Sequence, residues 1–279
     1  MRIISRTAII IISSFALIVV CGTTLFSAAM VNKNAATAAA ARTVSSSNSN
    51  TLRKVFCFGD SLTAGTSPPE RDVFPYAKHL EEALSTSDAG GPSAVVRWRG
   101  YPGWTASALL TDGGLSAFLD NIAQQQQQQD DAEKSSSSPP VDLVIILAGT
   151  NDLAYVSNGQ EIFDSIQGIH DIAHSKGCKT IALGIPPSGW QMQSDSARSI
   201  ADDVNTKLES WSNEHTKDSS SRATATFVPF PIQEFDRNSG LWSPDGLHFS
   251  PEGYKTIGES LAPILANILC NDDDNEETS

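Results

Sequence analysis

Short apolar segments alternate with amphipathic segments along most of this sequence, and that alternation constrains the fold more than any other feature. The apolar segments are rich in β-branched and aromatic residues, as strands are, and they cover residues 54–58, 94–98, 141–149, 179–185 and 225–230. Between them, apolar residues recur at helical spacing, over residues 74–84, 162–173 and 197–211. The pattern predicts a parallel sheet with helices on both faces.

The residues "SPEGY" at 250–254 predict the start of a last helix. Ser250 can cap this helix, and Pro251 suits its first position because the N–H that proline lacks would have no partner there. Pro263 lies within the predicted helix and is expected to kink it or end it early.

The N-terminal segment predicts a signal peptide or an uncleaved signal anchor within residues 1–30. Two arginines precede an uncharged stretch over residues 8–30, which is long enough to span a bilayer and ends in small residues that suit cleavage. In both cases the domain that follows is translocated. We therefore expect a secreted or extracytoplasmic protein, anchored to a membrane only if this segment is retained.

The folded domain is expected to cover residues 51–270. Residues 31–50, rich in Ala, Ser and Asn, predict a flexible linker, and residues 271–279 predict an acidic disordered tail. Within the domain, residues 124–140 are rich in Gln and Ser and predict a low-complexity loop, because they lack the apolar side chains that offset the entropy of ordering.

Charge and cysteine content exclude several classes of partner. The 279 residues carry a formal net charge of −13 at pH 7, and such a surface repels nucleic acid and anionic lipid headgroups. No spacing of cysteine and histidine suggests a zinc site, and neither a metal nor a cofactor is predicted. In an oxidising compartment, Cys178 and Cys270 are the plausible pair for a disulfide.

A serine, a histidine and an aspartate point to nucleophilic catalysis. Ser61 follows the first predicted strand, in "FGDSLTAG", at the edge where parallel sheets bind ligands. A serine hydroxyl needs a base, and His248 is the candidate, with Asp245 three residues earlier to orient its ring. Asp60 is expected to cap the following helix or brace the loop, because neighbouring side chains in a turn point apart.

Attack on an ester by Ser61 would create an oxyanion, which needs hydrogen-bond donors already aimed at it. The backbone N–H groups of Ser61 and Gly103 and the side-chain amide of Asn151 are the candidates. Trp104 and Trp190 follow nearby strands and are candidates for the substrate pocket, although packing also explains them. The remaining histidines lie in predicted helices and are expected to have surface or packing roles; they are His79, His170, His174 and His215.

Four segments together resemble the GDSL, or SGNH, hydrolase family. They are "GDSLTAG", Gly103 in "RGYPGWTAS", "GTND" at 149–152 and "DGLH" at 245–248. The resemblance implies a three-layer α/β/α, flavodoxin-like domain with a five-stranded parallel sheet. It also implies hydrolysis of an ester through a covalent acyl-enzyme. The family acts on simple, lipid, thio and acetylated carbohydrate esters, so the substrate stays open.

Two other functions use the same sequence features. One is an acyltransferase that passes the acyl group to a sugar or another alcohol instead of water. The other is a non-catalytic cell-surface binding module on the same fold. Transfer to an added acceptor would distinguish the first, and failure to react with a fluorophosphonate probe would favour the second.

Overall fold

The computed structural model describes residues 52–86, 93–129, 138–215 and 223–270. Five parallel strands form one sheet in the order β2-β1-β3-β4-β5. The strands are β1 (Arg53–Asp60), β2 (Ala94–Tyr101), β3 (Leu143–Leu147), β4 (Lys179–Leu183) and β5 (Ala225–Val228). Each overlaps a segment predicted to be a strand, so the predicted fold class is confirmed, although β1 and β2 extend beyond the predicted residues 54–58 and 94–98. The predicted leader, linker and acidic tail lie outside the described residues.

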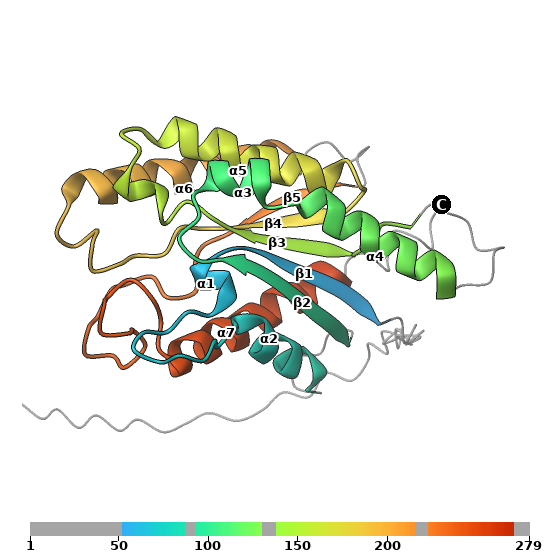
Figure 1. The fold of residues 1–279 in the computed structure, drawn as a ribbon, viewed down its shortest axis with the longest axis horizontal. Coiled ribbons are helices and arrows are strands. Elements are labelled where there is room, and N and C mark those ends of the chain that lie inside the picture. The colour runs from blue at the N-terminus through green and yellow to red at the C-terminus, as the bar shows by residue number, and fades with distance from the viewer. Residues whose placement is uncertain (1–51, 87–92, 130–137, 216–222, 271–279) are drawn as a thin grey trace, which may run out of the picture. The chain divides into compact units, whose positions relative to one another are not determined.

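Helices cover both faces of the sheet (Figure 1). One face carries α2 (Tyr76–Ser85) and α7 (Pro251–Cys270), which pack against each other. The other face carries α3 (Ala106–Asp112), α4 (Leu115–Gln129), α5 (Gly159–His174) and α6 (Asp195–His215).

The sheet separates two apolar cores because successive side chains of a strand point to opposite faces. Along β1, Val55 and Cys57 belong to the core under α2 and α7, whereas Phe56 and Phe58 belong to the core under the other helices. The chain leaves β1 towards β2 on one side and crosses to β3 on the other. The carboxyl ends of β1 and β3 therefore flank the switch point, where such sheets bind ligands.

Two helices differ from the sequence prediction. Helix α4 continues to Gln129, through the first part of the predicted loop, because buried Leu115 and Leu119 anchor its start and glutamine is a good helix former. Helix α7 does not end at Pro263. The proline lies on the exposed side of the helix, and the buried stripe that continues through Leu265 and Leu269 offsets the lost hydrogen bond.

The predicted disulfide between Cys178 and Cys270 is wrong, because both cysteines are free. Cys178 is buried in the core on the side of α5 and α6, whereas Cys270 ends α7 on the opposite face of the sheet. Among the described residues, no helix is both long and apolar enough to cross a membrane.

Candidate active site

Ser61 is the first residue of a short helix, α1 (Ser61–Ala64), that begins directly after β1. The side chain of Asp60 caps this helix, because its Oδ1 accepts the backbone N–H of Leu62 at 2.9 Å. Gly59 permits the close packing around the turn, since a Cβ at this position would lie 2.1 Å from the carbonyl oxygen of Leu147. Ser61 is consequently held at the carboxyl edge of the sheet with 5% of its surface exposed.

The structure brings His248 to Ser61 from the long segment between β5 and α7. The Nε2 atom of His248 lies 3.0 Å from the Oγ of Ser61, and its Nδ1 lies 2.7 Å from the Oδ2 of Asp245. A carboxylate can only accept a hydrogen bond, so the ring proton is on Nδ1. Nε2 then has a free lone pair that faces the serine hydroxyl.

Asp245 is held in a turn that keeps it ionised. Its Oδ1 accepts the backbone N–H groups of Leu247 at 2.9 Å and of His248 at 3.0 Å. Partial burial opposes ionisation, but these bonds and the bond from the His248 ring outweigh it and lower the pKa of Asp245 below its ordinary value. The ionised carboxylate can therefore orient the imidazole near neutral pH.

Hydrogen bonds fix this turn against the loop that follows α1. The hydroxyl of Ser243 donates to the carbonyl of Phe249 at 2.9 Å, so it accepts from the hydroxyl of Ser67 at 3.2 Å. The hydroxyl of Tyr254, on α7, donates to the carbonyl of Thr66 at 2.7 Å. These links join two segments that lie more than 170 residues apart in the sequence.

The predicted oxyanion donors come from the ends of β1, β2 and β3. Gly103 adopts a positive φ of 82°, and a Cβ there would meet nothing within 4 Å, so the space beside its backbone is open. No hydrogen bond engages the Gly103 N–H within the described part of the chain. The N–H of Ser61 heads a helix and has no acceptor inside that helix. The Gly103 N–H is therefore available to a substrate oxygen.

Asn151 is braced by two partners that the sequence did not predict. Its Nδ2 donates to the carbonyl of Trp104 at 2.9 Å and to the Oδ2 of Asp60 at 3.4 Å. The second distance exceeds the ordinary range of about 2.7–3.2 Å, so this contact is weak, and a substrate oxygen can share its hydrogen with Asp60. No signal in the sequence identified either partner.

The two predicted pocket tryptophans differ in their surroundings. Trp104 is partly buried and stacks on Tyr101 with ring centroids 4.4 Å apart, so packing accounts for much of its contact area. Trp190 follows β4 and is 52% exposed. Of these two side chains, Trp190 has the larger surface that a ligand can still cover.

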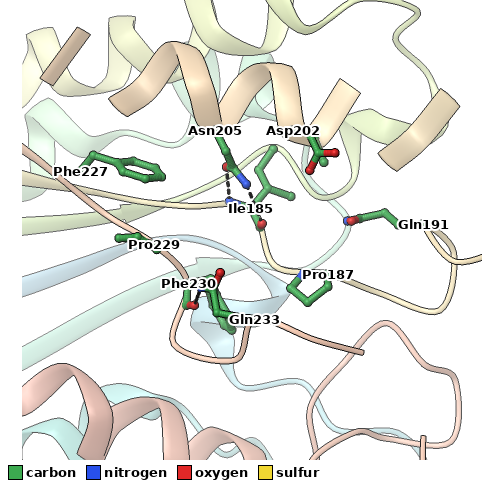
Figure 2. Close-up of a pocket in the computed structure, with 10 residues that line it drawn as sticks. Ile185, Pro187, Gln191, Asp202, Asn205, Phe227, Pro229, Phe230 and Gln233 are labelled. Atoms are coloured by element: carbon green, nitrogen blue, oxygen red, sulfur yellow. Dashed lines mark hydrogen bonds between the residues drawn. The ribbon is translucent and has the colours of Figure 1, made fainter. Parts of the chain in front are cut away.

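A pocket of about 240 Å³ lies beyond the carboxyl ends of β4 and β5 (Figure 2). Asn205 of α6 shapes its wall, since its side-chain amide exchanges hydrogen bonds with both the N–H and the C=O of Ile185. None of the predicted site residues lines this pocket. In the part of the chain that the structure covers, no cluster of His, Cys, Asp or Glu side chains could hold a metal ion.

Solved structures with the same fold include several esterases. A family 3 carbohydrate esterase from Clostridium thermocellum matches with a TM-score of 0.54 and 20% identity, covering 79% of this chain and 98% of its own. The carbohydrate acetylesterase Est24 from Sinorhizobium meliloti matches with a TM-score of 0.52 and 19% identity, covering 77% of this chain and 99% of its own.

An acetyl esterase variant solved with an acetate ion matches with a TM-score of 0.50 and 18% identity, covering 79% of this chain and 99% of its own. At these identities the likeness shows the fold. No curated protein matches the sequence.

The family model described as the GDSL-like Lipase/Acylhydrolase family matches residues 57–256, which is more than half of the chain. The match includes Ser61, Gly103, Asn151, Asp245 and His248. The chain therefore belongs to the GDSL-like lipase/acylhydrolase family and is a hydrolase that acts on ester bonds.

Proposed function

We propose that this protein hydrolyses carboxylic esters through a serine nucleophile, Ser61, activated by His248 and Asp245. The observation that carries the proposal is the continuous hydrogen-bonded series from Asp245 through His248 to Ser61, with distances of 2.7 and 3.0 Å. Its geometry supports transfer of a proton from the hydroxyl to a neutral imidazole whose other nitrogen is bound to a carboxylate.

The reaction proceeds in two steps. The Oγ of Ser61 attacks the acyl carbonyl while the Nε2 of His248 takes the hydroxyl proton, and the same nitrogen then gives this proton to the departing alcohol. A water molecule, deprotonated by His248, attacks the carbonyl of the resulting acyl-enzyme. The bond to Oγ breaks, His248 returns the proton to Ser61, and the carboxylic acid leaves. Asp245 stabilises the imidazolium that forms in both steps.

The negative charge on the carbonyl oxygen is stabilised by the N–H groups of Ser61 and Gly103 and by the amide of Asn151. Each comes from a different strand end, so the fold of the sheet edge fixes their relative positions before the substrate binds. Loss of one such donor typically lowers kcat by about a hundred- to a thousandfold.

Short acyl esters are the first substrates to test. Structures with the same fold include acetyl esterases, and the exposed ring of Trp190 and the partly buried ring of Trp104 are the candidate contacts for the acyl or alcohol group. An acyl series from acetate to octanoate, measured beside an acetylated polysaccharide, separates simple esters, lipids and carbohydrates.

The test is hydrolysis of p-nitrophenyl acetate by the purified domain. We expect Ser61→Ala to lower kcat by about a thousandfold or more, because the oxyanion hole and the substrate-binding residues alone give only a small part of the rate enhancement. Ser116→Ala is the matched control and should keep full activity, because the hydroxyl of Ser116 bonds to Asp120 of the same helix, α4, and not to a predicted site residue. Equal turnover by Ser61→Ala and the wild type would reject the proposal.

We also propose that the domain acts outside the cytosol, either secreted or anchored by the N-terminal segment. The support is the uncharged stretch over residues 8–30, which lies outside the described residues. Membrane fractionation and sequencing of the mature N-terminus would distinguish the two forms, and a full-length protein recovered from the cytosol would contradict both.

A further inference from the structure

Asp60 is a buried acid that the proposed mechanism does not use. Its exposed fraction is 0%, and no Lys, Arg or His within the described ranges forms an ion pair with it. Burial raises the pKa of Asp60 to about 7, and the nearby carboxylate of Asp152 adds to this effect. A buried carboxyl group without a cation is costly, so its position calls for a structural reason.

The two oxygens of Asp60 serve two different donors. Oδ1 accepts the backbone N–H of Leu62 at 2.9 Å, and Oδ2 faces the Nδ2 of Asn151 at 3.4 Å. The groups that interact electrostatically with Asp60 are Asp152, after β3, and the phenols of Tyr76 on α2 and Tyr254 on α7, whose pKa values are raised by burial and by this acid. All of them are neutral or acidic.

These contacts connect Asp60 to all three candidate oxyanion donors. The bond to Leu62 fixes the first turn of α1 and with it the N–H of Ser61. The contact with Asn151 orients the amide, and the other hydrogen of that amide is bound to the carbonyl of Trp104, directly after Gly103. One carboxyl group thus lies beneath the ends of β1, β2 and β3.

We propose that Asp60 is a positioning residue that sets the oxyanion hole by holding the amide of Asn151 and the start of α1 in register. The proposal rests on the proposed function, because it assigns Asn151 to the hole. A carboxylate suits the position because both of its oxygens accept. An amide has a single acceptor oxygen, so Asp60→Asn satisfies either Leu62 or Asn151 and turns its NH₂ group towards the other donor.

Two variants of Asp60 distinguish its role as the cap of α1 from its contact with Asn151. Asp60→Asn keeps the shape of the side chain but loses one acceptor. Asp60→Ser keeps a good helix cap, but its short side chain does not reach Asn151. Asp142→Asn is the matched control, since Asp142 accepts the backbone N–H of Lys54 at 2.7 Å at the opposite end of β1.

The experiment is a double-mutant cycle with Asn151→Ala, measured as kcat and KM for p-nitrophenyl acetate and normalised to the fraction of enzyme labelled by a fluorophosphonate. We expect Asn151→Ala to lower kcat about a hundredfold, and Asp60→Asn and Asp60→Ser to lower it about tenfold. KM should change less than threefold. In the Asn151→Ala background, Asp60→Ser should have less than a twofold effect, because it keeps the helix cap and its only lost contact is the one with Asn151.

Additive effects would overturn the proposal, because a general structural role lowers kcat equally with or without Asn151. An unchanged kcat in both Asp60 variants, or in Asn151→Ala, would overturn it as well. Asp60→Ser covers the case in which Asp60→Asn does not fold. Failure of the proposed function gives a different result: the wild type then shows no turnover that depends on Ser61, whatever residue occupies position 60.

Discussion

Two histidine environments lie at opposite edges of the same sheet, and their partners differ. At the carboxyl edge, His248 bonds to the carboxylate of Asp245 through one nitrogen and to the hydroxyl of Ser61 through the other. At the amino edge, His170 and His174 of α5 both bond to the hydroxyl of Thr180, at 2.7 and 2.9 Å. The first arrangement stabilises an imidazolium and the second does not.

Burial and neighbouring histidine rings also lower the pKa values of the histidines at the amino edge. His170 is fully buried, and burial, with the nearby His174 and His215, lowers its pKa well below the ordinary value. The pKa of His174 is lowered for the same reasons. The rings of all three lie against Trp211. The comparison teaches that a carboxylate partner, rather than the histidine itself, makes a general base.

The largest predicted difference between the two histidine environments is their effect on kcat. We expect His248→Ala to lower kcat for p-nitrophenyl acetate by about a thousandfold or more, because Ser61 then lacks its base. His174→Ala should leave kcat per folded molecule within twofold while lowering stability. Comparable losses of kcat in the two variants, at equal folded fractions, would remove the distinction between the two edges.

The next difference is in the pH dependence of stability. The folded-state pKa of His170 lies below 6.5, so near this pH the unfolded chain binds more protons at this position than the folded chain does. The free energy of unfolding should therefore decrease as the pH falls below about 6.5 and level off above it. His170→Gln should flatten this decrease. Urea unfolding between pH 5 and pH 8 measures it, and parallel curves for the variant and the wild type would contradict the prediction.

Asp60 should contribute to the same curves with the opposite sign. Its folded-state pKa, about 7, lies above its ordinary value of 3.8, so the folded chain binds the extra proton between these values. Its contribution to the free energy of unfolding therefore decreases as the pH rises from about 4 to 7. Asp60→Asn should remove that decrease, and an unchanged slope would show that Asp60 titrates as it does in the unfolded chain.

The smallest predicted effect concerns Thr180, which is 1% exposed and serves both histidines. Thr180→Val removes the hydroxyl that bonds to buried His170 and partly buried His174, so we expect a loss of about 1–3 kcal/mol in the free energy of unfolding. Thr180→Ser keeps the hydroxyl and should recover most of this loss. A valine variant as stable as the wild type would show that the shared hydrogen bonds contribute little.

Periodicity predicted the strands and the long helices because each one buries an apolar stripe or segment. The cap that Asp60 provides to α1 was one of the two roles expected for it and is confirmed. The short helix α3 escaped prediction, since a cap at Thr105 rather than periodicity defines it. The glutamine run of α4 was interpreted as a loop from its composition, although its buried first turns decide its structure. Helix α7 likewise continues past Pro263, because buried residues on both sides of the proline pack against the core, although a proline usually kinks or ends a helix.

The sequence predicted that Ser61, Gly103 and Asn151 lie together, because they follow the ends of β1, β2 and β3, which a parallel sheet brings to one edge. The loop that returns His248 across the sheet has no periodicity, and only the structure gives its path. The contact between Asp60 and Asn151 and the shared bonds of Thr180 join residues from separate elements. Their residue types occur in every protein, so composition and spacing carry no signal for them.

Peptide mapping after reaction with a fluorophosphonate tests the central claim most directly. The probe reacts with a serine only where a base activates its hydroxyl. We predict a single adduct, on the peptide that contains Ser61, which is absent in His248→Ala and retained in His174→Ala. An adduct on a different residue, or an unlabelled Ser61 in protein that hydrolyses p-nitrophenyl acetate, would contradict the assignment of Ser61 as the nucleophile.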